Sequence, residues 1–411
     1  MLKKNFSALL IAVSVILLHC AAYCASWEAV AGLVYNNDDL VSAAKQADSA
    51  HWSYNKAWTA YYPQVSLSGS YSETTQSGTD ETTKAYSTGF NVKQTLFSGF
   101  QNYNALRSAN ASYQQAVASY NKTLSDVYFN VRSAFIGLYI AQANIDLSGQ
   151  ILSRLSANAR MIKLMYDSGR EDRGNLMATQ ASQKNGEFGV SSAKRELELA
   201  RLKLSQLISA EISTTDGVMN LTFEAAPDFK MLAENCPAYL IAKYQLELAE
   251  IDDQNTLGEF LPTAQVSWGN QSSGTEWPTS SNSQGWNLNL SYSLFPGGAN
   301  IADKFINDLN QEKARRDFES SKKTVLLSIE DSYRSLRDAV ESLEVSRVLM
   351  DADSERAKIA DAKYQNGLMT FDEWNRIISD YINAQRSFLQ ARSTALQASA
   401  AWKNSYGGYE K

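Results

Sequence analysis

Histidine and cysteine are scarce in this chain of 411 residues, which contains two histidines and three cysteines. One histidine, His19, lies in an N-terminal apolar segment, so a processed chain would keep only His51. A Ser-His-Asp or Cys-His nucleophile, or a zinc site with several imidazoles, would depend on that single side chain. We therefore expect no enzyme active site, no cofactor and no metal centre.

Basic runs are also absent. The chain carries 38 Lys and Arg residues against 44 Asp and Glu, a formal net charge of −6, and no stretch interleaves basic with aromatic residues. Such a chain repels a phosphate backbone more often than it attracts one. Nucleic acid is therefore not an expected partner.

Long apolar runs are limited to the N-terminus. Two lysines precede an apolar run over 6–18 and small residues follow it, which is the pattern of a cleaved secretory signal. We predict a signal peptide over 1–25, with lipid attachment at Cys20 or Cys24 as the alternative. No later segment has eighteen apolar residues in succession, so any membrane-spanning part of the exported chain must consist of strands.

Glycine and proline are missing from residues 299–366, and apolar residues recur there at intervals of three and four. These residues are Val325, Ile329, Tyr333, Leu336, Val340 and Leu343. The pattern predicts one helix of about 100 Å at 1.5 Å per residue. A second long helix is predicted over 100–167, where the corresponding apolar residues are Val127, Val131, Phe135 and Leu138.

Each long helix is expected to end at a glycine turn that reverses the chain. The turn glycines are Gly169 and Gly367. Returning helices are predicted over 173–210 and 371–401, and further helices near 27–61 and 237–260. The sequence therefore predicts two long helical hairpins.

An internal repeat with an offset of 198 positions relates the two hairpins. Leu-Phe-Ser-Gly at 96–99 recurs as Leu-Phe-Pro-Gly at 294–297, and Tyr166 corresponds to Tyr364. The predicted organisation is a signal peptide at 1–25, a first repeat at 26–210, an equatorial linker at 211–235, a second repeat at 236–406 and a tail at 407–411.

Four segments alternate between apolar and polar residues, as strands with one apolar face do. They are 65–71, 87–96, 264–270 and 286–294, and polar loops are expected at 73–85 and 271–285. For any one of them a soluble, half-buried strand is the alternative. Four strands are too few to close a barrel, and an open edge is not tolerated in lipid, so a membrane barrel requires oligomerisation.

These features together resemble the TolC-like outer-membrane export ducts, also called outer membrane factors. The motifs that carry the resemblance are Tyr-Pro-Gln-Val at 62–65, Leu-Pro at 261–262, the repeated Leu-Phe-x-Gly junctions at 96–99 and 294–297, and Tyr-x-x-Gly at 166–169 and 364–367. The likeness extends over about 27–406, and the order, duplication and spacing of the motifs make it specific.

The resemblance implies a mainly α fold with a membrane β part. Long helical hairpins would form a periplasmic tunnel, and four strands per chain would form a trimeric, twelve-stranded β-barrel in outer-membrane lipid. It further implies an exit duct of a tripartite efflux or type I secretion system, with a large periplasmic portion. The partners would be a periplasmic adaptor protein and an inner-membrane pump.

The resemblance also assigns roles to residues by position. The adaptor-docking tips would be Ser168, Gly169, Arg170, Asn366, Gly367 and Leu368. The pore constriction would comprise Tyr364, Asp372, Glu373 and Asn175. This sequence departs from the family at Met369, where a basic closure residue is expected, and at Arg376, where a second acidic residue is expected.

Two alternatives follow from the residues themselves. Asp372 and Glu373 would favour the first turn of a helix through its dipole even without a pore. The whole chain could also be a non-barrel coiled-coil periplasmic adaptor or a surface structural protein, although it lacks the β-rich middle expected of an adaptor. Sedimentation with the outer membrane and migration as a trimer distinguish a duct from both.

Overall fold

A computed structural model describes residues 24–75, 82–212, 214–215, 221 and 227–409. The predicted signal peptide therefore lies outside the described residues except for its last two, and so does part of the predicted linker 211–235. The chain divides into two compact units. The helical unit comprises Met1–Val41, Lys122–Leu232 and Leu326–Lys411, and the strand unit comprises Ser42–Asn121 and Ala233–Val325.

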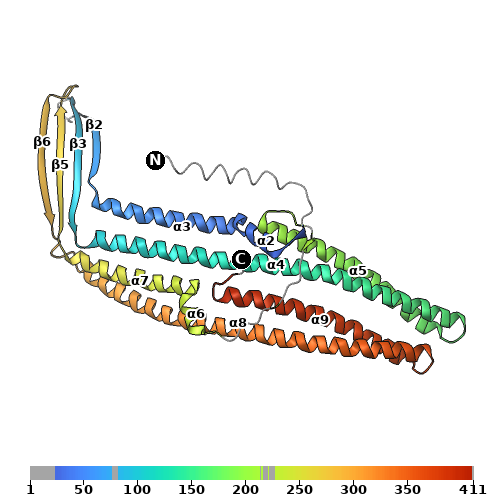
Figure 1. Cartoon of the computed structure of the whole chain (residues 1–411). Helices are drawn as coiled ribbons and strands as arrows, with labels where there is room; N and C mark the ends of the chain where they lie inside the picture. Colours follow the sequence, from blue (N-terminus) through green and yellow to red (C-terminus); the bar gives the residue numbers. More distant parts are fainter. Residues whose placement is uncertain (1–23, 76–81, 213, 216–220, 222–226, 410–411) are drawn as a thin grey trace. The chain divides into compact units, whose positions relative to one another are not determined.

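The two predicted long helices are confirmed. They are α4 (Gln101–Asp167) and α8 (Ala299–Gln365), each of 67 residues. Each is followed by a returning helix, α5 (Arg173–Ile208) or α9 (Phe371–Ser405), so that the chain forms a first hairpin from α4 and α5 and a second hairpin from α8 and α9 (Figure 1). Among the described residues, no helix combines the length and the apolar character needed to cross a membrane.

The predicted apolar stripes are the buried faces of the long helices. In α4, Val127 and Val131 are 4% and 0% exposed, and Phe135 and Leu138 are 1% and 0% exposed. In α8, Ile329 is fully buried. Spacing by three and four residues therefore predicted the packed face of each hairpin, because it keeps these side chains on one side of the helix.

The single helix expected near 27–61 is wrong, because the structure interrupts it at Asn37. Helix α2 (Trp27–Leu33) runs into a 3-10 turn, and α3 (Asp38–Ala57) begins afresh. The side-chain oxygen of Asn37 accepts hydrogen bonds from the backbone N–H groups of Asp39 and Leu40 at 3.0 and 3.3 Å. Asparagine in this position caps a new helix and so competes with continuation of the previous one.

The shorter elements complete the chain. They are β1 (Cys24–Ala25), which pairs in parallel with β4 (Thr214–Thr215), the helices α6 (Phe229–Asn235) and α7 (Pro237–Leu257), and the 3-10 turns η1 (Val34–Asn36), η2 (Trp58–Tyr61) and η3 (Gly258–Phe260). Helix α7 confirms the prediction of a helix near 237–260.

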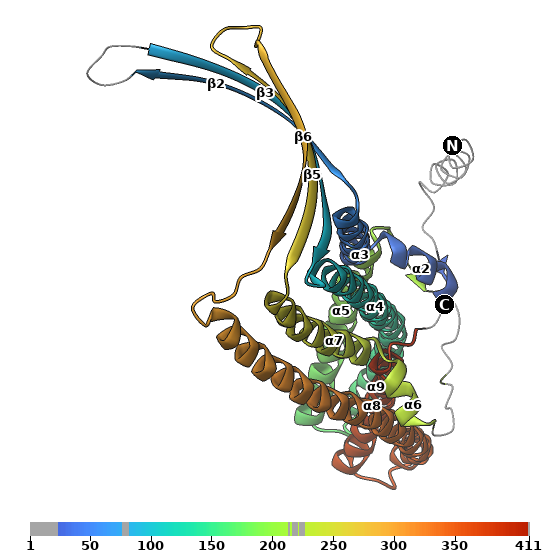
Figure 2. The same ribbon diagram turned by 90° about the vertical axis from the view of Figure 1, so that its left-hand side faces the viewer.

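The four predicted strands form one antiparallel sheet in the order β2-β3-β5-β6 (Figure 1). Their bounds are β2 (Gln64–Thr75), β3 (Thr82–Ser98), β5 (Thr263–Gly274) and β6 (Ser281–Ser291). In Figure 2 the β2–β3 and β5–β6 hairpins diverge towards their turns. In the order given above, β2 and β6 are the edge strands of this sheet.

All four strands are longer than predicted, and the last one also ends earlier. Most of the described residues of the expected loops 73–85 and 271–285 are strand, because the backbone ladder continues through polar residues. Residues 76–81 of the first loop lie outside the described residues. The expected extension of the last strand to Leu294 is wrong. The final backbone pair joins Thr263 to Ser291, so beyond Ser291 strand β5 offers no further partner.

The register gives the sheet one apolar and one polar face. Paired residues form rows across the four strands, and alternate rows point to opposite faces. One row consists of Val65, Val92, Trp268 and Trp286. The ring of Trp268 lies 6.5 Å from that of Trp286 and 6.0 Å from that of Phe90, so an aromatic group occupies this apolar face.

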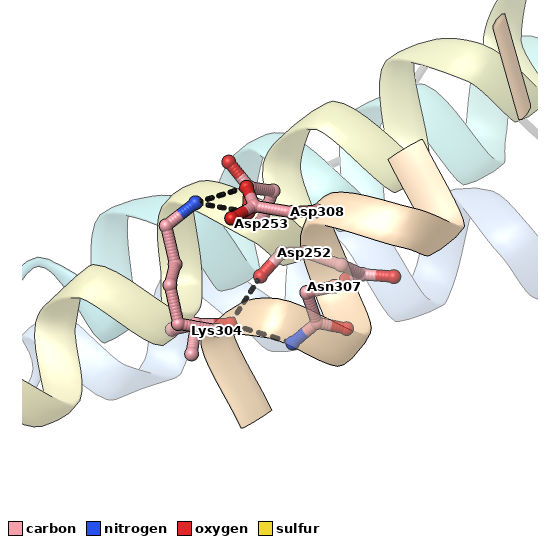
Figure 3. A network of polar contacts seen from close by, with 6 residues as sticks. Asp252, Asp253, Lys304, Asn307 and Asp308 are labelled. Atoms are coloured by element: carbon pink, nitrogen blue, oxygen red, sulfur yellow. Dashed lines mark hydrogen bonds and ion pairs between the residues drawn. The ribbon is translucent and has the colours of Figure 1, made fainter. Parts of the chain in front are cut away.

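A polar network joins α7 to the start of α8 within the strand unit (Figure 3). Lys304 Nζ contacts Asp253 Oδ1 at 2.6 Å and also pairs with Asp308. In the same region, Asn307 Nδ2 donates to Thr256 Oγ1 at 2.6 Å. Thr256 is 3% exposed, so this network satisfies polar groups at a buried helix contact.

Candidate functional site at the hairpin tips

Each hairpin reverses at a short exposed turn. The first tip is defined as 168–170 and the second tip as 366–368, and all six residues are exposed. Gly169 and Gly367 have φ of +74° and +71°, a region that glycine adopts without steric cost. The N–H of Arg170 donates to the carbonyl of Met165, so the first tip is a Schellman cap.

The second tip has the same construction. The N–H of Leu368 donates to the carbonyl of Lys363 at 2.9 Å, and that of Gly367 to the carbonyl of Tyr364 at 3.0 Å. Two equal caps terminate two equal helices, which explains why the Tyr-x-x-Gly motif recurs with the repeat. Leu368 is 76% exposed, so the second tip presents an apolar side chain outward.

The returning helices begin with capped first turns. The side chain of Asp172 accepts from the N–H of Asn175 at 2.9 Å, and that of Thr370 accepts from the N–H of Glu373 at 3.3 Å. Asp372 and Glu373 are exposed in the first turn of α9. Carboxylates there are stabilised by the positive end of the helix dipole, and they also place two negative charges beside the second tip.

Tyr364 lies in the interior of the helical unit at 4% exposure. Its ring stacks on Trp374 with centroids 4.7 Å apart and planes at 12°. Its hydroxyl donates to Glu171 Oε1, and Asn175 Nδ2 donates to Glu171 Oε2 at 2.8 Å. Burial, and secondly the bond to Glu171, raise the pKa of Tyr364, so its hydroxyl remains a hydrogen-bond donor at neutral pH.

A second polar link lies one turn away on α8. Arg154 Nη2 of α4 contacts Asp361 Oδ2 at 2.6 Å, and the other oxygen of Asp361 accepts from Trp374 Nε1 at 2.9 Å. The Arg154 guanidinium also lies 5.2 Å from the ring centroid of Tyr381. Asp361 of α8 therefore connects to α4 through Arg154 and to α9 through Trp374. The first of these contacts joins the two hairpins, and the second lies within the second hairpin.

An apolar cluster supports both links. Its buried members are Ile151, Ile162, Ala357, Ala360, Tyr364, Phe371, Trp374, Ile377, Ile378 and Ile382. Because Trp374 is 1% exposed, its indole N–H requires the acceptor that Asp361 provides. The tip region thus combines a packed interior with two hydrogen-bonded connections between the hairpins.

The structure brings some predicted site residues together and separates others. Tyr364 and Asn175 meet through Glu171. Asp372 and Glu373 are exposed and lie outside this network. Met369 packs against the apolar cluster, so it contributes contacts rather than charge.

Sequence reasoning missed Glu171, Arg154, Asp361 and Trp374. The repeat offset pairs Glu171 with Met369 and Trp374 with Leu176, so comparing the two halves conceals both. Arg154 and Asp361 are 207 residues apart, and no local pattern marks such a pair. The one signal that could have identified them is a charged residue on a helix face that the apolar spacing predicts to be buried.

Two long helical hairpins, a four-stranded sheet with one apolar face, and matched tips define the channel-tunnel class of outer-membrane proteins. The sequence matches the outer membrane efflux protein family over 33–210 and 249–408, and the chain belongs to this family. It is an exit duct of an efflux system in the outer membrane, with a large periplasmic helical portion. The family is one of transport ducts rather than of enzymes.

Solved structures share the fold at low sequence identity. A structure of CusC, described as forming a transmembrane channel, has a TM-score of 0.85 and 16% identity, covering 93% of this chain and 92% of that one. A membrane protein from Pseudomonas aeruginosa gives 0.83 and 16%, covering 92% and 90%. The CmeC outer membrane channel of Campylobacter jejuni gives 0.82 and 15%, covering 93% and 85%. No curated protein matches the sequence.

Proposed function

We propose that three copies of this chain form the exit duct of a tripartite efflux or type I secretion system. Each copy contributes four strands to one twelve-stranded barrel and two hairpins to a periplasmic tunnel. Substrates enter from an inner-membrane pump through a periplasmic adaptor and leave passively through the barrel. The match to the outer membrane efflux protein family and the likeness to CusC, whose structure is described as forming a transmembrane channel, support the assignment.

The sheet carries the argument for assembly. Within the described residues its edge strands are β2 and β6, and their outer backbone groups have no strand partner. The apolar face exposes Leu67 at 83% and Leu288 at 69%, which in water is unfavourable and in lipid is not. Pairing β6 of one copy with β2 of the next satisfies both edges and closes the barrel.

Aromatic residues support the same orientation. Trp268 and Trp286 lie on the apolar face, and Trp277 is 64% exposed in the β5–β6 turn. Tryptophan is enriched where hydrocarbon meets the polar headgroups. We assign Trp277 to the membrane interface, and Trp268 and Trp286, which lie in the middle of β5 and β6, to the lipid-facing surface.

The tips supply the periplasmic entrance in this proposal. The exposed residues Ser168, Gly169 and Arg170 of the first tip, with those of the second, dock the adaptor. Asp372 and Glu373, from three copies, form an acidic constriction that favours cations. Tyr364 and Asn175 hold the two hairpins through Glu171 and so keep that constriction narrow.

The assembly is tested by moving a charge onto one face of the sheet. Leu288→Arg places arginine on the apolar face, and Asn287→Arg makes the same change one residue away on the polar face. An arginine facing lipid near the middle of a strand costs about 2 to 4 kcal/mol. We expect Leu288→Arg to reduce the trimer recovered from outer membranes in mild detergent, and Asn287→Arg to leave it near wild type.

Equal trimer levels in both variants would contradict the lipid-facing assignment. The entrance is tested separately with cysteines placed at Ser168 and Asn366, which should crosslink to the adaptor. A cysteine at Thr279, in the β5–β6 turn, should instead react with an impermeant reagent outside the cell. The reverse pattern would invert the topology.

A further inference from the structure

Among the described residues, the polar face of the sheet carries a single charged residue. Apart from Lys93, the described strand residues on this face are serine, threonine, asparagine, glutamine, glycine and one alanine. The other charged residues of the four strands, Glu73 and Lys84, are paired opposite each other on the apolar face. An otherwise neutral face therefore contains one positive charge in each chain.

The described residues that pair with Lys93 across the sheet include no compensating carboxylate. Lys93 pairs with Gln64 on β2 and with Ser267 on β5, and Ser267 pairs in turn with Asn287 on β6. Amide and hydroxyl groups therefore occupy the whole row. Among the described residues no ion pair involves Lys93, whose side chain is exposed. The positive charge of Lys93 therefore acts on the solutes that lie next to the polar face.

The polar face lines the lumen in the proposed trimer, because the apolar face must contact lipid. Lys93 lies five residues before Ser98, the end of β3, and α4 begins at Gln101. We propose that Lys93 from three copies forms a positive ring in the barrel near the start of the tunnel helices. This ring makes the exit favour anionic over cationic solutes, an inference that rests on the proposed trimer.

The size of the effect follows from barrel dimensions. Twelve strands about 4.8 Å apart and tilted by about 40° enclose a radius of about 12 Å. Three lysine side chains that point inward then place their ammonium groups about 8 Å from the axis, which is close to the Debye length of about 10 Å at 0.1 M salt. Coulomb interaction in water at about 8 Å, with that screening, enriches monovalent anions about threefold on the axis and depletes monovalent cations about threefold, so their ratio changes about tenfold. At 1 M salt the screening removes nearly all of this preference.

Ion selectivity of the purified trimer in planar bilayers tests the ring. The reversal potential under a KCl gradient gives the ratio of chloride to potassium permeability. We expect Lys93→Gln to lower this ratio about tenfold at 0.1 M salt and hardly at all at 1 M, and Lys93→Arg to preserve it. Lys84→Gln is the matched control, since it removes the same charge from the same strand on the opposite face.

A cysteine variant allows the charge to be changed after the trimer has assembled, so the result does not depend on how a substitution affects folding. Lys93→Cys can be labelled in the assembled channel with a cationic or an anionic thiol reagent, and Cys236 is buried at 4% exposure. The cationic label should restore the wild-type ratio and the anionic label should lower it further. An unchanged ratio in Lys93→Gln trimers, or an equal shift in Lys84→Gln, would overturn the ring. Failure of the wild-type chain to form trimers would instead refute the proposed function.

Discussion

Asp361→Asn removes the charge that connects the two hairpins while preserving most of the local packing. The asparagine carbonyl still accepts the hydrogen bond from Trp374 Nε1, but its amide group now faces Arg154. The perturbation is therefore specific for the Arg154 contact between α4 and α8. We expect it to loosen the tips of the hairpins rather than to unfold them.

The magnitude follows from the exposure of the pair. The side chains of Arg154 and Asp361 are 27% and 33% exposed, between the surface pairs that contribute up to about 1 kcal/mol and the buried pairs whose disruption costs about 3 to 5. We take about 1 to 2 kcal/mol per chain. In the proposed trimer three copies act together, so the balance between a narrow and a widened constriction at the tips shifts by about 3 to 6 kcal/mol, or 100-fold and more.

Single-channel recording of the purified trimer measures this shift directly. Asp361→Asn should increase the time spent in high-conductance states, and cells that carry it should become sensitive to large antibiotics that the outer membrane normally excludes. Arg347→Gln is the matched control, because it breaks a pair with Glu344 in which both side chains are more than half exposed and both lie on α8. It should behave as wild type.

A double variant gives the sharpest refutation. Arg154→Gln combined with Asp361→Asn should open the channel hardly more than either single change, since both remove the same interaction. Additive effects, or wild-type conductance in Asp361→Asn, would show that the pair does not hold the tips.

Two further predictions concern the other polar contacts. Tyr364→Phe removes the hydroxyl that donates to Glu171, so it should raise conductance in the same assay. Tyr166→Phe, at the corresponding position of the repeat and 38% exposed, should leave conductance unchanged. Equal effects of the two changes would refute a role for the hydroxyl. Lys304 has a raised pKa, chiefly from its hydrogen bonds to two aspartates, and it lowers the pKa of Asp308. The Asp308 contribution is present above the ordinary carboxyl pKa and lost on acidification, and the Lys304 contribution is lost only as pH rises through its raised pKa. Lys304→Gln should therefore lower the melting temperature, followed by circular dichroism, at pH 7 and progressively less as the pH falls below the ordinary carboxyl pKa, whereas Lys313→Gln should have little effect over this range.

Much of the fold could be predicted because it follows from local patterns. Spacing by three and four residues without breakers indicates the long helices, and alternation indicates the strands. The exceptions have local chemistry that periodicity ignores. Asn37 starts a new helix with its own side chain, and β6 stops where its partner strand runs out.

The candidate site could be predicted only in part. Position in the repeat locates Gly169 and Gly367, because a left-handed turn requires glycine wherever it occurs. It also locates Tyr364, but not what Tyr364 contacts. Its partner Glu171 is 193 residues away along the chain, and the position equivalent to Glu171 in the other half is occupied by Met369.

The sequence by itself determined the elements of this protein: two long hairpins, two strand pairs, matched glycine turns and their duplication. Periodicity and steric restriction act within a few residues, so they are legible without a structure. Only the tertiary structure decided which charged groups meet at the tips, and the strand register decided that Lys93 lies on a face whose described residues include no carboxylate. Contacts between distant residues depend on how whole helices and strands pack and align, and no local rule contains that information.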